Sequence, residues 1–128
     1  MTDSNLHESA STAGRLTTHV LDTMQGRPAC GMAVELYAWL DNAWQLIKQV
    51  HTNDDGRVDA PMLAGADFKV GRYRLVFDVE GYFRAQGVAL PEPAFLGKVP
   101  LDFGLAQATH YHVPLLVSPF GYSTYRGS

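Results

Sequence analysis

The feature that most limits the fold is a series of short segments in which apolar and polar residues alternate along the chain. Alternation with a period of two is typical of half-buried β-strands. Turn residues separate the segments, for example Asp41-Asn42 and the run Asn-Asp-Asp-Gly at 53–56. The clearest segments are residues 16–22, 32–40, 43–52, 71–81 and 109–117. About seven or eight such strands at regular spacing predict an all-β sandwich rather than a parallel sheet.

Four other segments are less regular. Residues 58–63 predict a short strand that Pro61 confines to a sheet edge or a bulge. Residues 82–90 are the one place where the pattern favours a helix, which would be short and marginal on its own. We expect strands over 95–103 and 122–126, and a hairpin formed by 32–40 and 43–52.

Size and charge narrow the class of protein. A chain of 128 residues corresponds to one ordinary domain, which we place at 15–128 after a polar, disordered tail at 1–14. The formal charge of −3, with 10 Lys and Arg in all, provides no basic face for nucleic acid. The chain has no apolar stretch of membrane-spanning length and no basic-then-apolar leader, so we expect no membrane partner and a cytoplasmic location. The lone Cys30 excludes a disulfide framework.

The residues able to do chemistry gather toward the C-terminus, where chains are usually frayed and polar. His110 and His112 are two apart, so on a strand they project from the same face. Histidines and arginines occur with no recognisable nucleophile motif, since there is no Gly-x-Ser-x-Gly elbow. The candidates are His19, Arg57, His110, His112, Tyr125 and Arg126.

Each candidate, taken singly, is more often structural than functional. A histidine on a half-buried strand is usually a hydrogen-bonded structural residue, and Arg57 after a turn is most often a surface charge. Zinc is an alternative because His110 and His112 form a common ligand pair to which His19 could add a third. No carboxylate or cysteine has recognisable ligand spacing, so we expect no metal, and no glycine-rich phosphate loop is present.

Histidines and arginine without a covalent nucleophile suit acid-base hydrolysis of an activated carbonyl by water. A histidine near its free pKa can take a proton from water and return it to a leaving nitrogen. An arginine can hold a planar ligand through parallel hydrogen bonds and oppose the charge on a developing oxyanion. The residue types therefore favour a small, planar, polar substrate.

Two blocks of the chain resemble the transthyretin-like family of 5-hydroxyisourate hydrolases. The first is His19-Val20-Leu21-Asp22, followed by Gly26, Pro28 and Ala29, with histidine where the hormone carriers have lysine. The second is 111–123 and the terminal tetrapeptide Tyr-Arg-Gly-Ser at 125–128, which the carriers lack. The resemblance spans about residues 15–128, and it departs from the family at Phe95-Leu96-Gly97-Lys98, where relatives often have Phe-Pro-Glu.

The resemblance implies a fold, an activity and an assembly. The fold is a transthyretin-like (prealbumin-like) β-sandwich of two four-stranded sheets with one short helix. The activity is hydrolysis of the lactam ring of 5-hydroxyisourate to 2-oxo-4-hydroxy-4-carboxy-5-ureidoimidazoline in urate degradation, without a cofactor. The assembly is a homotetramer whose sites line the groove between two dimers.

Roles for individual residues also follow from the resemblance. His19, Arg57, His112 and Ser128 are implied as catalytic, and His19, Arg57, Tyr125 and Arg126 are implied to contact substrate. Either His112 or His19 would be the general base, Arg57 would hold an oxygen of the substrate, and Tyr125 and Ser128 would close the pocket. Two alternatives remain: a carrier that binds a small ligand in the tetramer channel, and a structural β-sandwich whose histidines are scattered.

Overall fold

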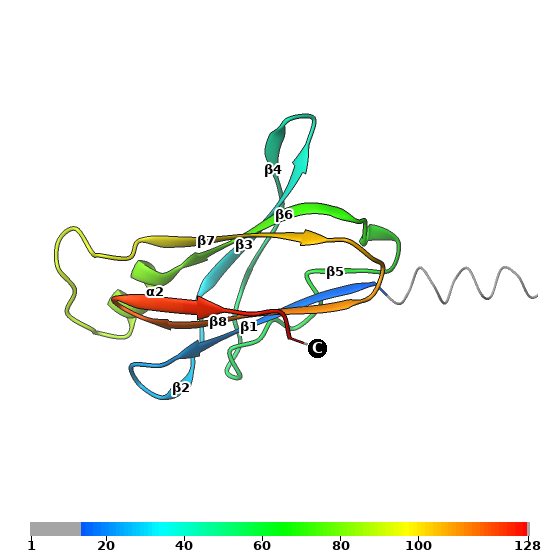
Figure 1. Ribbon diagram of the computed structural model, residues 1–128. Coiled ribbons are helices and arrows are strands. Elements are labelled where there is room, and N and C mark those ends of the chain that lie inside the picture. Colours follow the sequence, from blue (N-terminus) through cyan, green and yellow to red (C-terminus); the bar gives the residue numbers. More distant parts are fainter. Residues whose placement is uncertain (1–13, 128) are drawn as a thin grey trace, which may run out of the picture.

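Two β-sheets, in which most strand pairs are antiparallel, pack face to face in the computed structural model, which describes residues 14–127 (Figure 1). The first sheet has the order β2-β1-β8-β9, with β5 pairing to β1, and the second has the order β4-β3-β6-β7. The strands of the first sheet are β1 (Arg15–Asp22), β2 (Arg27–Pro28), β5 (Leu63–Ala64), β8 (His110–Ser118) and β9 (Gly121–Thr124). Those of the second are β3 (Ala33–Leu40), β4 (Ala43–His51), β6 (Gly71–Asp78) and β7 (Lys98–Leu105). The predicted all-β sandwich is confirmed.

The first sheet differs in two details from the expected arrangement. It contains five strands rather than four, because the two-residue strands β2 and β5 both pair with β1. β1 and β8 run parallel over their whole length, so the first sheet is mixed. Sequence periodicity shows which face of a strand is buried, but it does not show which strand will be its neighbour.

The predicted hairpin is confirmed. β3 and β4 pair in antiparallel register and project beyond the two layers (Figure 1). Asp41 and Asn42 connect them with φ angles of 53° and 62°. Both residues are in the left-handed region, which the favoured two-residue hairpin turn requires and which Asn and Asp tolerate.

The segment predicted as a strand at 58–63 is mostly loop. Only Leu63 and its neighbour Ala64 enter a strand, β5, and a short 3₁₀ helix, η1 (Gly65–Asp67), follows. Arg57, just before the segment, instead forms an isolated antiparallel bridge with His19 of β1. The expected strand at 95–103 begins three residues late, at Lys98, and continues to Leu105.

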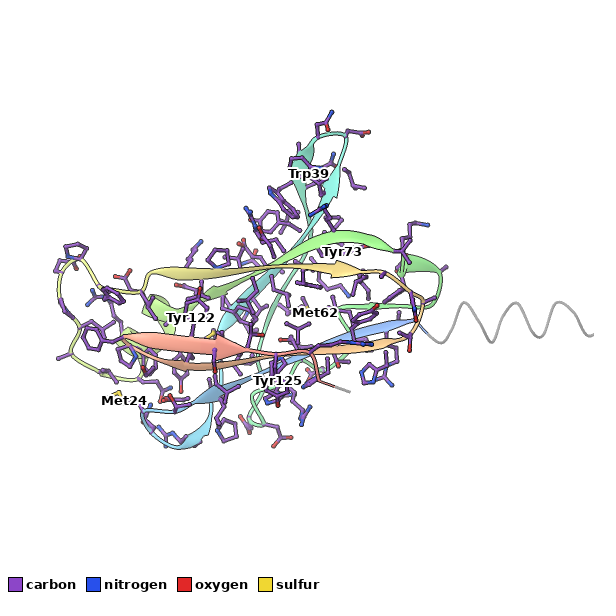
Figure 2. All side chains as sticks on the ribbon, viewed as in Figure 1. Met24, Trp39, Met62, Tyr73, Tyr122 and Tyr125 are labelled. Carbon is purple, nitrogen blue, oxygen red and sulfur yellow. The ribbon has the colours of Figure 1, made fainter. Side chains whose placement is uncertain are left out.

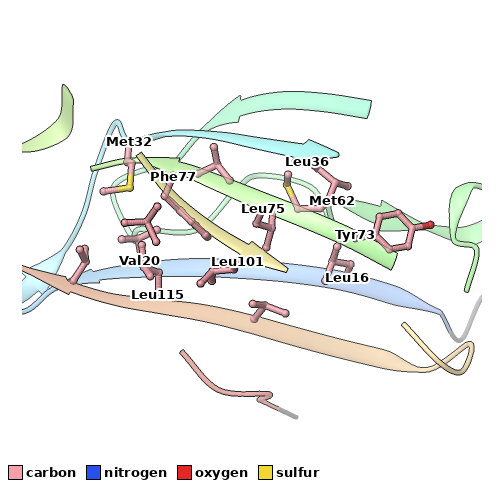
Figure 3. Close-up of a cluster of buried hydrophobic side chains, with 14 of the residues drawn as sticks. Leu16, Val20, Met32, Leu36, Met62, Tyr73, Leu75, Phe77, Leu101 and Leu115 are labelled. Carbon is pink, nitrogen blue, oxygen red and sulfur yellow. The ribbon is translucent and has the colours of Figure 1, made fainter. Parts of the chain in front are cut away.

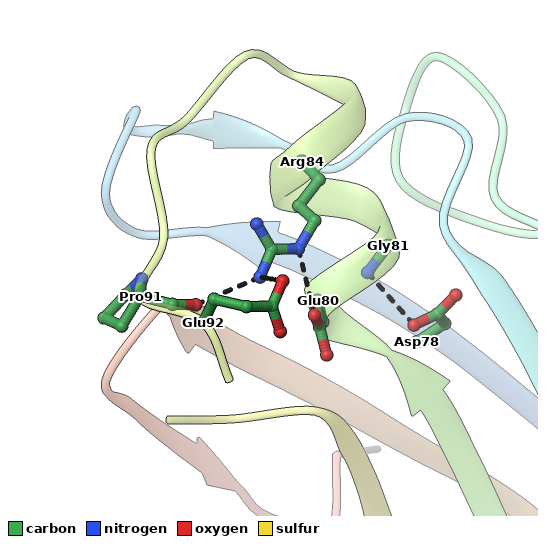
Figure 4. Close-up of polar contacts among 6 residues, drawn as sticks. All are labelled: Asp78, Glu80, Gly81, Arg84, Pro91 and Glu92. Atoms are coloured by element: carbon green, nitrogen blue, oxygen red, sulfur yellow. Dashed lines mark hydrogen bonds and ion pairs between the residues drawn. The ribbon is translucent and has the colours of Figure 1, made fainter. Parts of the chain in front are cut away.

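The helix predicted at 82–90 is wrong in its position. The helix α2 spans Val79–Ala85, because Asp78 caps it by accepting a hydrogen bond from the backbone N–H of Gly81 at 3.0 Å (Figure 4). Arg84 pairs with Glu80 one turn earlier and with Glu92 beyond the helix. Gly87, with φ of 80°, ends it in the left-handed conformation favoured after a helix. Within residues 14–127 no helix has the length and apolar character needed to cross a membrane.

The core lies between the two sheets and is formed by the inward side chains of their strands (Figure 3). Fully buried members include Leu16, Val20 and Leu115 from the first sheet and Leu75 and Phe77 from the second. Burying a side chain of this size stabilises the fold by about 1.5–3 kcal/mol. Among residues 14–127, every buried side-chain nitrogen and oxygen has a hydrogen-bond partner.

The alternation of buried and exposed residues along β1 and β8 also determines which side chains face away from the core. Because Leu16, Thr18 and Val20 of β1 and Tyr111 and Val113 of β8 point inward, the residues that alternate with them point outward. Thr17 of β1 lies directly opposite His112 of β8 in the parallel register. The outer face of the first sheet therefore displays Thr17, His19, His110 and His112.

Two expectations concern residues near the ends of the chain. The tail expected at 1–14 falls outside the described residues apart from Gly14, which is buried against the ring of Phe68. Ser128, expected to be catalytic, also lies outside them.

Candidate active site

The outer face of β1 and β8 carries a row of directly hydrogen-bonded side chains. Nδ1 of His19 lies 2.6 Å from Nε2 of His112. Nδ1 of His112 lies 2.7 Å from the hydroxyl of Thr17, which is 3.0 Å from Nε2 of His110. The His19 and His112 rings are within 21° of parallel. His19 and His112, which are far apart in the sequence, thus share one hydrogen bond.

Arg57 reaches this face through the turn at 53–56. The side chain of Asn53 accepts hydrogen bonds from the backbone N–H groups of Asp55 and Arg57, which closes the turn. The backbone N–H of Val20 then donates to the carbonyl of Gly56 at 2.8 Å, next to the bridge between His19 and Arg57. Gly56 is buried with φ of 73°, and a Cβ there would lie 2.5 Å from the Val20 carbonyl oxygen. Only glycine fits this approach without strain.

The C-terminal residues approach the row from its other side. The backbone N–H of Gly127 donates to the carbonyl of His112 at 2.6 Å. The guanidinium of Arg126 lies over the Tyr111 ring, 4.2 Å from its centroid, and donates to the His110 carbonyl. Arg126 therefore contacts the strand that carries the histidines, and Gly127 packs against the His112 side chain.

Tyr125 is not beside the histidines within this chain. It is 58% exposed and lies close to the C-terminal end of the chain (Figure 2). There it lines a groove with residues of β7 and with Tyr111 and Val113. The structure thus brings His19, Arg57, His110 and His112 together and leaves Tyr125 outside this group.

Both central histidines are held in the neutral form. Burial lowers the pKa of His112 to about 4, and the charges of His19, Arg57 and His110 add to the effect. Burial also lowers the pKa of His19, with a further contribution from Arg57. An imidazole whose pKa is lowered in this way remains unprotonated at neutral pH and can accept a proton.

A hollow of about 360 Å³ opens beside the histidines. Its charged and titratable lining consists of Arg15, Arg57, Asp59, His110 and His112. A larger hollow of about 650 Å³ lies under the β3–β4 hairpin, but no histidine lines it. We take the smaller hollow as the candidate site because His112, whose pKa is lowered by burial, lines it together with Arg57 and His110.

The geometry favours hydrogen bonding over metal binding at these histidines. Both ring nitrogens of His112 are already engaged, one by Thr17 and the other by His19. Among residues 14–127 no group of three or more His, Cys, Asp or Glu side chains is placed to hold a metal ion. Cys30 is exposed, and its hydrogen bond to Asp54 raises its pKa, which disfavours the nucleophilic thiolate.

Two residues of this region, Thr17 and Asp22, were not identified as candidates from the sequence. Thr17 was not a candidate, although its position two residues before His19 places both side chains on the same strand face. Asp22 is fully buried, accepts hydrogen bonds from the Tyr82 hydroxyl and from Gln25, and so anchors the end of β1 to α2. A strand-face count could have found Thr17, whereas the pairing of Asp22 with Tyr82 depends on the tertiary fold.

Sequence comparison gives a family and close relatives. The model of the HIUase/Transthyretin family matches residues 16–127. The chain is 62% identical to 5-hydroxyisourate hydrolase 2 of Rhizobium meliloti over 92% of its own length and 99% of the relative's. It is 59% identical to the 5-hydroxyisourate hydrolase of Mesorhizobium japonicum over 94% of its own length and 97% of the relative's.

Solved structures share the fold. The crystal structure of (S)-allantoin synthase matches with a TM-score of 0.87 and 43% identity over 93% of this chain, which spans 45% of that longer chain. The crystal structure of sea bream transthyretin in complex with thyroxine matches with a TM-score of 0.79 and 28% identity, over 88% of this chain and 94% of that one. The same sandwich therefore occurs in proteins named as enzymes and as transthyretins.

Proposed function

The chain belongs to the HIUase/transthyretin family, and on this premise we propose that it hydrolyses 5-hydroxyisourate. It opens the lactam ring with water and gives 2-oxo-4-hydroxy-4-carboxy-5-ureidoimidazoline, a step of urate degradation. The observation that carries this function is the pair of neutral, hydrogen-bonded histidines with Arg57 beside them. Relatives that are 62% and 59% identical over nearly their whole length bear the name of this hydrolase.

His19 is the general base in this proposal. Both nitrogens of His112 are engaged, and within residues 14–127 Nε2 of His19 has no hydrogen-bond partner. That nitrogen takes a proton from water, whose oxygen then forms a bond to the lactam carbonyl carbon. His112 stabilises the protonated His19 through the hydrogen bond of 2.6 Å between Nε2 of His112 and Nδ1 of His19. A positioned base of this kind contributes about 10²- to 10⁴-fold to the rate.

Arg57 opposes the charge that develops on the carbonyl oxygen. Its guanidinium presents several N–H donors in a fixed plane. Arg15 and Arg57 both line the hollow, so an anionic or strongly polar heterocycle is attracted to it. Preorganised donors at the site of developing charge are worth about 10²- to 10³-fold each.

The remaining residues act through assembly in this proposal. The chain forms a homotetramer with sites between two dimers, and Tyr125, Arg126 and Ser128 help to close the pocket there. The exposure of Tyr125 supports this, because an exposed aromatic on an edge groove is available for burial by a partner subunit. The cytoplasmic location likewise stays a prediction.

The carrier is the second candidate function. It is favoured by the shared fold with the transthyretin that was solved in complex with thyroxine. Pockets for apolar ligands are mostly hydrophobic with few polar groups, whereas this hollow is lined by two arginines, an aspartate and two histidines. The polar lining supports the enzyme over the carrier.

The assay that separates the two functions follows freshly generated 5-hydroxyisourate, which also decays without help. We expect catalytic amounts of the protein to accelerate the decay and to give one product enantiomer. Bovine serum albumin at equal concentration controls for non-specific effects. A decay rate that is unchanged by the protein would exclude the hydrolase and leave the carrier.

A further inference from the structure

The row of hydrogen bonds on the outer sheet face continues beyond the two histidines to Thr17 and His110. We propose that Thr17 and His110 are positioning residues that set the protonation pattern of His112 and, through it, of His19. This inference rests on the proposed hydrolase function, because it assigns these residues a part in that reaction. We call the four side chains His110, Thr17, His112 and His19 the polar row.

The number of hydrogens in the polar row limits it to two arrangements. The Thr17 hydroxyl has one hydrogen but contacts an imidazole nitrogen on each side, at 2.7 and 3.0 Å. It must therefore donate to one histidine and accept from the other. The 2.6 Å contact between His19 and His112 likewise holds one hydrogen when both rings are neutral. The direction of one hydrogen bond thus fixes the direction of all three.

One arrangement prepares His19 as a base. When each donor points toward His110, Nδ1 of His19 donates to His112, Nδ1 of His112 donates to Thr17, and Thr17 donates to His110. Nε2 of His19 is then free of hydrogen and can accept a proton from water. In the opposite arrangement Nε2 of His19 carries a proton that it can give to the leaving nitrogen of the opened ring.

The two arrangements interconvert by a balanced proton shift. A water proton binds to Nε2 of His19, and the freed electron pair on the water oxygen forms the bond to the carbonyl carbon. The Nδ1 proton of His19 passes to Nε2 of His112, the Nδ1 proton of His112 passes to the Thr17 oxygen, and the Thr17 hydroxyl proton passes to Nε2 of His110. The positive charge then rests on His110, and reversal of the same shifts returns the proton to the leaving nitrogen.

The surroundings favour His110 as the end of the row. The low pKa of His112, caused by burial and by the charges of His19, Arg57 and His110, disfavours a resting charge on the central ring. Besides the hollow with Arg15, Arg57 and Asp59, His110 borders a second hollow with Thr109, Arg126 and Gly127. His110 is half-buried, so solvent reaches part of its side chain.

The test compares two substitutions of Thr17 in the full-length protein. Thr17→Val removes the hydroxyl and retains a branched side chain, whereas Thr17→Ser retains the hydroxyl. We expect T17V to lower kcat about tenfold or more with little change in KM, and T17S to remain within about threefold of wild type. Thr23→Val is the control, since the Thr23 hydroxyl likewise bonds to β8, at the Val117 carbonyl, but lies outside the polar row. Wild-type kcat in T17V, or an equal loss in T17S and T17V, would overturn the inference.

His110→Asn provides a second test that does not depend on the folding of T17V. Asparagine can hydrogen-bond to Thr17 but cannot take up a proton, so kcat should fall about tenfold while KM is retained. A wild-type kcat in H110N would refute the role of the polar row even if T17V does not fold. If the wild-type chain itself fails to accelerate 5-hydroxyisourate decay, the proposed function fails. An active wild type with unaffected T17V and H110N refutes this inference alone.

Discussion

At the scale of single residues, we propose that Arg57 acts in two ways on the same site. Its charge lies where it can oppose an oxyanion, and it also lowers the pKa of His19 and His112, secondary to burial for both. Both effects require only that the guanidinium lie close to the histidines, which the bridge between His19 and Arg57 ensures. In this proposal, substrate stabilisation and base activation are therefore coupled through one side chain.

The first prediction concerns the pH profile of Arg57→Gln. A histidine accepts a proton only when it is neutral, so the rate falls as the pH drops below its pKa. Removal of the positive charge raises the pKa of both histidines, so the fall in kcat/KM begins at a higher pH than in wild type. We also expect a loss of about 10²-fold at the optimum. Arg72→Gln, at an exposed position on the other sheet, is the matched control. An acid limb that stays in place or moves to lower pH would contradict the assigned electrostatic role.

At the scale of elements, the turn at 53–56 positions Arg57. Gly56 is the residue that permits it, because the Val20 carbonyl occupies the space of a side chain there. The turn was recognised from its Asn-Asp-Asp-Gly composition, but its attachment to β1 was not.

We predict that Gly56→Ala impairs both folding and activity. The alanine Cβ would be 2.5 Å from the Val20 oxygen, so the turn must move and carry Arg57 away from His19. The expected loss is about 1–3 kcal/mol in the free energy of unfolding, with a clear drop in kcat/KM. Gly87→Ala is the control, because Gly87 has a similar φ but nothing within 4 Å of its Cβ position. Chemical denaturation and the decay assay measure both effects, and equal activity losses in the two variants would refute the positional role of Gly56.

The junction of β1 and α2 gives a stability prediction that spares the site. Tyr82 donates to the fully buried carboxylate of Asp22 at 2.8 Å, and burial raises the pKa of the Tyr82 hydroxyl above its usual range. Tyr82→Phe leaves one buried acceptor with fewer donors, which should cost about 1–3 kcal/mol of unfolding free energy. Tyr37→Phe, which removes a half-buried contact to Glu35, should cost less than about 1 kcal/mol. Urea denaturation measures the free energy of unfolding of both variants. Equal losses of that free energy would contradict the explanation by the buried carboxylate.

Sequence periodicity predicted where the strands lie in the chain better than it predicted which strands pair. The predicted bounds of β1, β3, β4 and β8 agree with the structure within a residue or two. The segment predicted at 71–81 contains β6 but runs on into α2. Their alternation is local and repeated, which is why it could be recognised. α2 was misplaced because its start depends on the single cap at Asp78, while its apolar residues continue the preceding strand pattern. The two-residue strands β2 and β5 have no local pattern and exist only because β1 pairs with them.

The sequence pointed to His19, Arg57, His110 and His112 as candidates but not to the contacts that join them. The same-face placement of His110 and His112 follows from their spacing, and the family resemblance indicated His19 and Arg57. The contact of β1 with β8 joins residues more than 90 positions apart, as the bonds of Thr17 to His110 and His112 illustrate. No local pattern encodes such a pairing, so the contacts of Thr17 with the two histidines became visible only in the folded chain.

At the scale of the whole molecule, we propose that the C-terminal tetrapeptide links the site to assembly. We predict a homotetramer, four times 14.1 kDa or about 56 kDa, by analytical ultracentrifugation. Deletion of residues 125–128 removes Tyr125 and the Gly127 contact to His112, so kcat/KM should fall about tenfold or more and the tetramer should weaken. Deletion of residues 2–9, which precede the matched family region, is the control. Full activity in the truncated monomer would contradict a site completed by assembly.

The central claim is that the hydrogen-bonded pair of His19 and His112 performs proton transfer in hydrolysis. The most direct measurement is the initial rate of 5-hydroxyisourate consumption by His112→Asn beside wild type, at equal folded protein and saturating substrate. Asparagine retains hydrogen-bonding shape but cannot shuttle a proton, so turnover should fall at least about tenfold, or about 1.4 kcal/mol in activation free energy. Turnover equal to that of wild type would contradict the account.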